Sequence, residues 1–292
     1  MIGIEELDAL DLTIWLGRGA AAASRLGCTQ STISRRSNQC LQVFDLRLHR
    51  DDEGWPRVRE HDLLLLERQV HQLHRLRRGS GLRLDASLLA APLLAEGTPC
   101  GWICGGLDAL GWRRPMRLLE ERVLDAWITA MGQELATVCQ TTMLCIPLLI
   151  TPLQLACSSG HPLLRESRLR LEEVAGLPRL APRAGSYPRT ERLLGPWRQD
   201  REALQLESGP RRRPSLLDLP APEPVLHYGT RFSLAHQTRL QALPIDLGVQ
   251  SELTLVMRRD VCEEAAMLQL MDTLQRRGLQ AARLDLGSPG RN

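Results

Sequence analysis

Residues 20–43 read AAAASRLGCTQSTISRRSNQCLQV and decide how the N-terminal part folds. The segment predicts an alanine-rich helix that ends at Leu26, a break at Gly27 and Cys28, and a second helix that begins at Thr29. The Thr29 hydroxyl can accept a hydrogen bond from a free N–H group of the next turn, and Gly27 gives the backbone the freedom that a tight turn needs. The pattern is that of a helix-turn-helix.

The second helix has an apolar and a polar face when its residues are placed at about 100° intervals. Ile33, Cys40, Leu41 and Phe44 fall on the apolar side, and the outward side carries Ser31, Thr32, Arg35, Asn38 and Gln39. Arg, Asn and Gln can form paired hydrogen bonds with base edges in a DNA major groove, and Ser and Thr can contact phosphates. A solvated helix of a small bundle would show the same pattern, so this helix alone leaves both interpretations open.

The motifs around this helix resemble the N-terminal domain of LysR-type transcriptional regulators. Residues 7–16 are similar to the first helix of that domain, residues 18–26 (RGAAAASRL) to the segment before the turn, and residues 29–35 (TQSTISR) to the recognition signature. Residues 47–50 (RLHR) stand where the family has its wing motif. Three residues depart from the family pattern, in which Glu, Gly and Phe are usual: Leu41, Asp45 and His49.

The resemblance implies a winged helix-turn-helix that binds double-stranded DNA. The residues it assigns to DNA contacts are Thr29, Gln30, Ser31, Thr32, Ser34, Arg35, Asn38 and, from the wing, Arg50. The charge pattern agrees, because Asp45 is the one acid between residues 18 and 50, against Arg18, Arg25, Arg35, Arg36, Arg47 and Arg50. A cationic cluster on a chain with a formal net charge of only +3 is expected of a phosphate binder.

The wing is expected at residues 47–58, with a turn at residues 51–54 (DDEG) and a returning strand that begins at Trp55. Three consecutive acids in the turn would be repelled by phosphate. We therefore expect the DNA contacts of the wing to come from arginines on either side of the turn, namely Arg50, Arg57 and Arg59.

Residues 61–78 predict a long helix with an apolar seam at spacings of three and four. The seam comprises Leu63, Leu66, Val70 and Leu73, and Leu65 and Leu76 widen it. The seam predicts a homodimer, although an amphipathic helix docked on its own domain would show a similar pattern. In the resembling family this is the linker helix, and a dimer allows two half-sites to be read. Residues 79–81 (GSG) are expected to end the helix and act as a hinge.

Residues 82–292 alternate between strand and helix patterns, which predicts an α/β domain with parallel strands. The expected strands include residues 82–87, 100–104 and 252–258, and the expected helices include residues 88–96 and 117–123. Residues 118–128 and 152–178 are similar to segments of the LysR-type effector domain. The expected fold class is therefore α/β, with an N-terminal winged helix-turn-helix and a two-lobed, periplasmic-binding-protein-like effector domain. The expected divisions are residues 1–60 for the head, 61–81 for the linker helix and hinge, and 82–292 for the effector domain.

The resemblance implies a cleft between the two lobes that binds a small, often anionic, effector. Its predicted contacts are hydroxyl-bearing residues where strands meet helices: Ser87, Thr129, Ser186, Tyr187 and Thr230. The alternative is that the Ser87, Ser186 and Thr230 hydroxyls only cap their helices.

Other functions have little support in the sequence. We find no nucleophile elbow, no phosphate-binding or dinucleotide-binding glycine motif and no zinc-protease motif, so we expect neither an enzyme nor a cofactor. The eight cysteines are scattered without a metal-ligand spacing, so we expect no metal and reduced thiols. Acidic residues follow Met1 closely, and prolines break the apolar region 138–157, so we expect no signal peptide or membrane span and a cytoplasmic protein.

The sequence thus predicts a ligand-responsive, LysR-like regulator that binds operator DNA as a dimer or tetramer. Two alternatives remain: a helix-turn-helix assembly protein that has lost its ligand, and an enzyme of binding-protein-like fold with an accessory helical domain.

Overall fold

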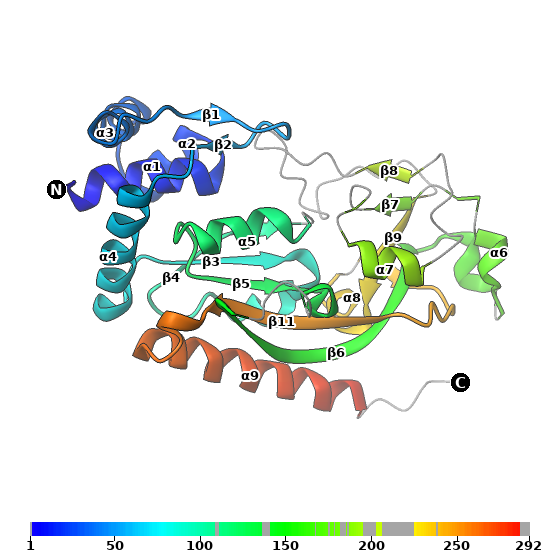
Figure 1. Ribbon diagram of the computed structural model, residues 1–292. Coiled ribbons are helices and arrows are strands. Elements are labelled where there is room, and N and C mark those ends of the chain that lie inside the picture. Colours follow the sequence, from blue (N-terminus) through cyan, green and yellow to red (C-terminus); the bar gives the residue numbers. More distant parts are fainter. Residues whose placement is uncertain are drawn as a thin grey trace.

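The computed structural model of the protein describes residues 2–108, 111–135, 141–166, 168–174, 176–177, 179–181, 185, 187–194, 203–205, 225–237 and 239–286. Three helices form the head at the N terminus: α1 (Ile4–Leu16), α2 (Gly19–Leu26) and α3 (Gln30–Val43). A two-stranded wing follows, formed by β1 (His49–Arg50) and β2 (Pro56–Arg57), which pair in antiparallel fashion (Figure 1).

The helix boundaries in the head follow from local capping. Helix α2 ends at Gly27, whose φ of 61° lies in the left-handed region that glycine adopts without strain. The Thr29 hydroxyl accepts a hydrogen bond from the Thr32 backbone N–H at 3.2 Å and so caps α3. The predicted helix-turn-helix is confirmed. Asp45 has a φ of 50°, which explains why glycine suits this position after the helix in the resembling family.

Helix α4 (Asp62–Arg78) leads from the head to the α/β part and ends at Gly79, with a φ of 65°. Within the described residues, nine strands then form one sheet in the order β4-β3-β5-β11-β6-β9-β7-β8, with β10 paired to β6. The strands are β3 (Leu82–Ser87), β4 (Trp102–Asp108), β5 (Ala126–Thr129), β6 (Met143–Ser158), β7 (Arg179–Ala181), β8 (Ala203–Gln205), β9 (Leu226–Thr230), β10 (Leu240–Ala242) and β11 (Gln250–Arg258).

The sheet mixes parallel and antiparallel pairs. Strand β3 is parallel to β4 and β5, and β7 is parallel to β8 and β9, as the alternation of strands and helices predicts. Strands β6 and β11 are antiparallel to each other and connect the two groups. Their register shifts where Thr254 faces Pro147 and Leu253 faces Leu149, because Pro147 lacks an N–H group for the ladder. Figure 1 shows β6 as a strongly curved strand.

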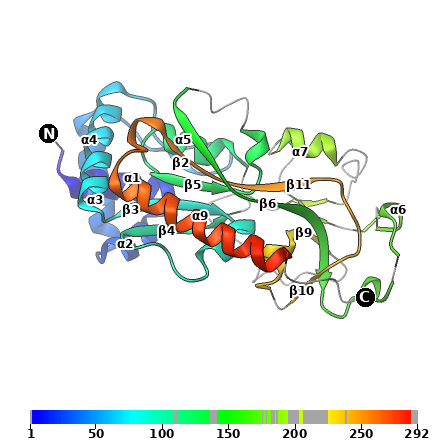
Figure 2. The same ribbon diagram turned by 90° about the horizontal axis from the view of Figure 1, so that it is seen from below.

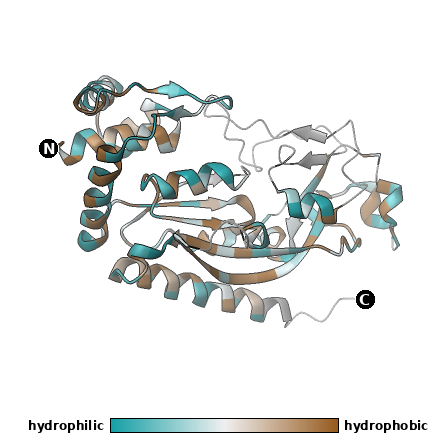
Figure 3. Ribbon diagram, viewed as in Figure 1, coloured by the Kyte–Doolittle hydropathy of each residue, from teal (hydrophilic) through white to brown (hydrophobic). Residues whose placement is uncertain are grey.

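Helices cover both faces of the sheet. Helix α5 (Arg113–Glu120) lies on one face, and α9 (Ala265–Leu286) runs along the other, as Figure 2 shows from below. The shorter elements are η1 (Leu88–Leu94), η2 (Gly132–Glu134), η3 (Pro162–Arg165), α6 (Leu171–Val174), α7 (Pro188–Leu193), α8 (Arg231–Leu234) and η5 (Arg259–Val261). Hydrophobic residues gather in the central strands, whereas the wing is hydrophilic (Figure 3).

Several boundaries differ from the prediction. The strand expected at residues 100–104 is β4 at residues 102–108, and Cys100 is exposed. The segment after Ser87 is a 3₁₀-helix that contains Pro92, in place of the expected regular helix. The helix expected at residues 117–123 begins and ends earlier, because Arg122 takes a left-handed φ of 59° and stops it.

One apolar cluster extends from the head into the α/β part. Leu7 and Trp15 of α1 belong to the same buried cluster as Leu118 of α5, Trp127 of β5 and Val256 of β11. These side chains are at most 3% exposed. The head is therefore packed on the first strands of the sheet, although the GSG segment predicts a hinge between them.

Candidate functional site

The outward face of α3 carries the predicted DNA contacts. Thr29, Gln30, Ser31, Ser34, Arg35 and Asn38 are exposed and Thr32 is half-buried, whereas Ile33, Cys40 and Leu41 pack inward, as predicted. The Thr29 and Thr32 hydroxyls are engaged in the cap, 3.0 Å apart. The Arg35 guanidinium has no hydrogen-bond or ion-pair partner among the described residues, whereas the adjacent Arg36 pairs with Glu5 of α1. Arg35 is thus the arginine of this pair that can reach another molecule.

The wing is tied to the α/β part through Asp51 and Trp55. One Asp51 carboxylate oxygen accepts hydrogen bonds from the backbone N–H groups of Glu53 (3.2 Å) and Trp55 (2.9 Å). Its other oxygen accepts from the Arg117 guanidinium of α5 at 3.2 Å. The Trp55 ring lies 3.7 Å from the Arg114 guanidinium carbon in a cation–π contact. Asp51 therefore holds the turn, and its charge is balanced by Arg117, a contact that the sequence did not predict.

A buried ionic network joins α1 and α4 to β3. Asp11 accepts hydrogen bonds from Arg68 Nε at 2.9 Å and from Arg83 Nη1 at 3.4 Å. A second nitrogen of Arg83 donates to Asp8 at 2.6 Å, and Arg68 also faces Glu121 at 3.4 Å. Burial raises the pKa of the Glu121 carboxyl above its ordinary value, although the neighbouring Arg68 and Arg117 charges oppose this shift.

A second part of the network is centred on Asp125, between the short helix α5 and β5. Its carboxylate, which is fully buried, accepts hydrogen bonds from Gln72 (3.0 Å), from Arg75 Nη2 (2.9 Å) and from the backbone N–H of Arg83 (2.8 Å). Arg122 extends the network, because it donates to Gln72 at 2.8 Å and pairs with Asp260. We did not predict these contacts. The sequence does carry one sign of them: Asp125 is a charged residue inside the otherwise apolar run 123–128, and a buried charge needs partners.

Helix α4 has two different faces. Leu64, Gln72, Arg75 and Leu76 are buried, and Gln72 and Arg75 donate to Asp125 of the α/β part. On the opposite side Leu63, Leu66 and Val70 are 61%, 58% and 62% exposed, and Leu73 is half-buried. The buried face agrees with the alternative of a helix docked on its own domain. Most of the residues of the predicted dimer seam lie on the outward face.

Three of the predicted effector contacts surround one apolar cluster formed by Met131, Leu153, Tyr187 and Val249. Tyr187 is itself a member, the fully buried Thr129 hydroxyl accepts a hydrogen bond from the Met131 N–H at 3.2 Å, and Thr230 pairs with Leu153 across the sheet. The Thr230 hydroxyl also accepts from the Ser233 N–H at 3.0 Å in a capping box. Its capping role is therefore confirmed.

The other two predicted effector contacts are placed differently. Ser87 is half-buried at the end of β3 and makes no side-chain cap. Ser186 lies outside the residues that the structure describes.

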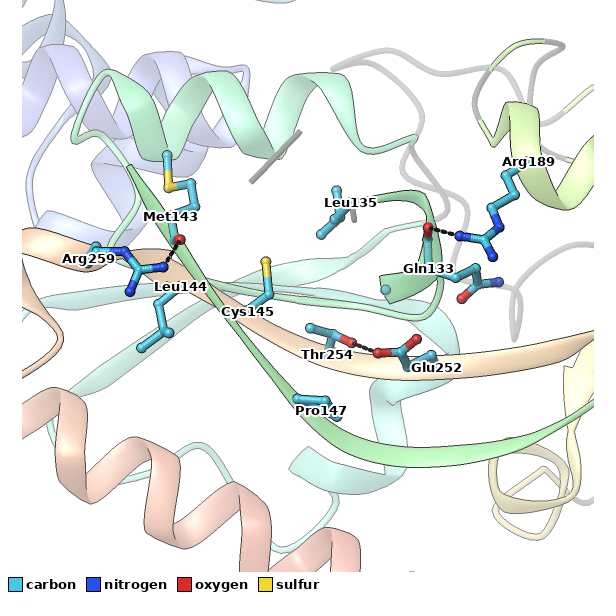
Figure 4. A pocket seen from close by; sticks show the side chains of 11 residues that line it. Gln133, Leu135, Met143, Leu144, Cys145, Pro147, Arg189, Glu252, Thr254 and Arg259 are labelled. Carbon is cyan, nitrogen blue, oxygen red and sulfur yellow. Dashed lines mark hydrogen bonds between the residues drawn. The ribbon is translucent and has the colours of Figure 1, made fainter. Parts of the chain in front are cut away.

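A pocket of about 460 Å³ opens beside this cluster, between η2, α7, β6 and β11. Figure 4 shows Arg189 and Arg259 at opposite ends, with Glu252 and Thr254 from β11 between them. The full set of lining residues is Gly132, Gln133, Leu135, Met143, Leu144, Cys145, Pro147, Arg189, Glu252, Thr254 and Arg259. Sequence reasoning missed this site, because its residues come from four separate segments.

The thiols show no sign of a metal or disulfide site in the described part of the chain. The seven cysteines described there are free, and no group of three potential metal ligands lies together. Burial, with a smaller contribution from the Asp11 charge, raises the pKa of the Cys40 thiol to about 12. None of the described helices has both the length and the apolar character that crossing a membrane requires.

No family model and no curated protein matches the sequence, but solved structures do. Full-length CbnR complexed with its target DNA aligns with 94% of this chain and 99% of its own, at 14% identity and a TM-score of 0.50. A full-length OxyR variant from Pseudomonas aeruginosa aligns with 94% of this chain and 98% of its own, at 15% identity and the same TM-score. Both are LysR-type regulators. The chain has the fold of a full-length LysR-type regulator.

The LysR-type fold accounts for the order of the elements. The head comes first, α4 follows it, and the α/β part contains two groups of parallel strands joined by β6 and β11. The fold class predicted from the sequence is confirmed, over nearly the whole chain. At this level of identity the likeness concerns the fold, so the roles of individual residues have to be argued from the contacts described above.

Proposed function

We propose that the protein is a ligand-responsive transcriptional regulator that binds operator DNA through α3. The observation that carries this proposal is the outward face of α3, where Gln30, Ser34, Arg35 and Asn38 are exposed. These side chains project from a helix held in a LysR-type head, and Arg35 has no partner in the described part of the chain. Long polar side chains on such a helix are suited to base edges in the major groove.

The proposed roles follow the three parts of the chain: residues 1–60 would bind DNA, residues 61–81 would pair two subunits, and residues 82–292 would sense an effector. Ser31 and Arg50 would add contacts beside α3, while Thr29 and Thr32 would chiefly shape the start of the helix through their cap. The exposed Leu63, Leu66 and Val70 support a homodimer, and pairs of dimers would form a tetramer. The protein would act in the cytoplasm, where operator DNA is accessible.

The first prediction concerns Arg35. Arg35→Ala is expected to cost about 1 to 3 kcal/mol of specific DNA binding, because it removes a cation that can form two hydrogen bonds with a guanine. The measurement is a footprint on the DNA upstream of the protein's own gene at two salt concentrations. Wild-type protein is expected to protect two half-sites one or more helical turns apart.

The control for this experiment is Arg36→Ala, which removes the same charge from the adjacent position. The Arg36 guanidinium is turned toward Glu5, so this variant should lose only the sequence-independent part of binding. Equal sequence preference in wild-type protein and the Arg35→Ala variant would show that α3 does not read DNA.

A further inference from the structure

The two strands of the wing differ in exposure. His49 and Arg50 of β1 are exposed, whereas Trp55, Pro56 and Val58, in and beside β2, are buried. Figure 1 shows β2 between β1 and α5. A two-stranded ribbon is marginally stable by itself in water, so the position of the wing depends on what its inner strand contacts. Strand β1 follows the inner strand through their pairing, in which Arg50 faces Pro56.

The inner strand of the wing contacts α5 of the first lobe through a stacked pair. The Trp55 ring lies 3.7 Å from the guanidinium carbon of Arg114. Arg114 is buried and is held from two other sides, because it donates to the Trp15 carbonyl of α1 at 2.5 Å and its Nη1 lies 4.0 Å from the Asp85 carboxylate of β3. A planar guanidinium fixed in this way gives the indole a defined surface on which to stack.

A second contact from α5 reaches the turn of the wing. Arg117 Nη2 donates to one oxygen of Asp51 at 3.2 Å, and the other oxygen of Asp51 accepts from two backbone N–H groups of the turn, at 3.2 and 2.9 Å. In the same turn the Gly54 carbonyl accepts a hydrogen bond from the Arg50 guanidinium. Hydrogen bonds therefore connect a residue of the lobe, through the turn, to the exposed cation of β1.

Arg117 is itself held in place. The carboxylate of Glu121, one turn further along α5, lies 3.9 Å from Arg117 Nε and 3.4 Å from the Arg68 guanidinium of α4. The side chains of Arg117 and Asp51 are 22% and 21% exposed. Exposed ion pairs contribute little because their side chains stay mobile, but these partners are largely shielded and are held by further polar contacts. The pair can therefore define a position for the turn.

We propose that α5 positions the wing for DNA binding, and that Arg117 is the positioning residue. Through Asp51, Arg117 keeps the turn in the conformation that presents Arg50 to phosphates beside the half-site. The stacking of Trp55 on Arg114 keeps β2 in place. The inference rests on the proposed function, because it concerns the wing of the proposed DNA-binding head. It adds that the first lobe contributes to DNA binding by setting the position of the wing in its own subunit.

The test is hydroxyl-radical footprinting and binding titration of the full chain, on the DNA upstream of its own gene, at several salt concentrations. Arg117→Gln should keep the protection given by α3 but lose protection of the flanking backbone. Affinity should fall about three- to tenfold, and the slope of log affinity against log salt should fall by about 0.9 for each lost phosphate contact. Arg113→Gln is the matched control, because it removes the same charge from an exposed position of α5 that makes no described contact with the wing.

Asp51→Asn separates positioning from charge. The amide keeps an oxygen that can accept from the turn, but it loses the ion pair with Arg117. If only charge mattered, removal of an acid near phosphates would strengthen DNA binding. Positioning predicts the opposite, so Asp51→Asn should also lose the flanking protection. Arg50→Ala should weaken binding by the wild-type chain at least about threefold, and should have little further effect in the Arg117→Gln chain.

The inference is overturned if Arg117→Gln, shown to be folded by circular dichroism, keeps the flanking protection. It is also overturned if Asp51→Asn binds more tightly with that protection unchanged, or if Arg50→Ala costs the same affinity in both chains. Each of these results would leave the half-sites protected by the wild-type chain and the proposed function intact. Absence of any protection by the wild-type chain would overturn the proposed function, and the inference with it.

Discussion

At the scale of single residues, His227 of β9 is a buried titratable group outside the set of residues proposed to contact DNA. His227 is only 4% exposed, and its Nδ1 atom has no hydrogen-bond partner among the described residues. Burial therefore lowers its pKa below the ordinary value of 6.5, because the charged ring would lose its hydration. Burial lowers the pKa of His71 on α4 as well, although neighbouring acids oppose the shift.

The second prediction concerns the stability of the protein in mild acid. The folded pKa of His227 lies below the unfolded value, so the unfolded chain binds this proton more readily. The contribution of the neutral His227 ring to the free energy of unfolding is complete above about pH 6.5. It is lost as the pH falls through the pKa of the folded state. Urea unfolding between about pH 8 and pH 5 should show this loss, and His227→Gln should reduce it.

The His227→Gln variant also separates this effect from the carboxylates. Burial alone would raise the pKa of the Asp260 carboxyl, but hydrogen bonds and charges from Arg258 and Arg122 together outweigh it and lower the pKa below the ordinary value of 3.8. The stability that Asp260 contributes is therefore lost only in more acidic solution than the stability that His227 contributes. If wild-type protein and the variant lose equal stability between about pH 7 and pH 5, His227 is not buried in its neutral form.

At the scale of elements, α4 determines how the head and the lobes are joined. Its inward face supplies Arg68, Gln72 and Arg75 to the buried network, and α1 and β3 supply Asp11 and Arg83. Buried charges contribute little net stability when all are paired, but removal of one partner leaves another charge without compensation. The network therefore fixes which face of α4 docks more than it adds to the free energy of folding.

The third prediction is that Asp125→Asn lowers the free energy of unfolding by about 3 to 5 kcal/mol. The variant keeps the shape of the side chain but leaves Arg75 buried without its ion-pair partner at 2.9 Å. The matched control is Asp272→Asn on α9, which breaks an ion pair with Arg276 that is about two-thirds exposed. The control should cost less than about 1 kcal/mol. Equal losses in urea unfolding would show that Asp125 is solvated.

The fourth prediction tests the outward face of α4. Replacing Leu63, Leu66 and Val70 together by Asn should dissociate the proposed dimer, because the apolar seam would be lost. The unfolding free energy per subunit should change little, since all three side chains are more than half exposed in the single chain. Sedimentation velocity measures the mass, and circular dichroism confirms folding. An unchanged sedimentation coefficient would place the dimer interface elsewhere.

At the scale of the whole molecule, the head and the first strands of the sheet share one apolar cluster and one ionic network. Trp15 of α1 and Trp127 of β5 are both buried in that cluster, and Arg114 of α5 donates to the Trp15 carbonyl at 2.5 Å. Arg25 of α2 also donates to the Cys104 carbonyl of β4 at 2.8 Å. A change in the arrangement of the lobes would therefore move the head with the first lobe.

The fifth prediction is that the head does not unfold before the first lobe. Heating should give one cooperative transition for both, because α1 would expose Leu7 and Trp15 if it separated. The measurement is differential scanning calorimetry of the full chain beside circular dichroism. A separate transition of the head at lower temperature would show that the shared cluster does not couple the two parts.

Local chemistry explains why much of this arrangement was predictable. The helix-turn-helix depends on Gly27 and the Thr29 cap, and the end of α4 depends on Gly79, which are contacts within a few residues of sequence. Strand positions such as β11 followed from their apolar runs. The early end of α5 was missed because it depends on Arg122, whose left-handed backbone is accompanied by contacts to the distant Gln72 and Asp260.

The sequence by itself determined the helix-turn-helix, the polar face of α3, the apolar seam of α4 and the α/β class, because each depends on capping or periodicity among neighbouring residues. Only the tertiary structure decided that Asp51 faces Arg117, that Asp125 accepts hydrogen bonds from three residues, and that Arg189 and Arg259 line one pocket. Those contacts join segments far apart in the chain. Their existence depends on how the strands are ordered in the sheet, and that order leaves no local signal in the sequence.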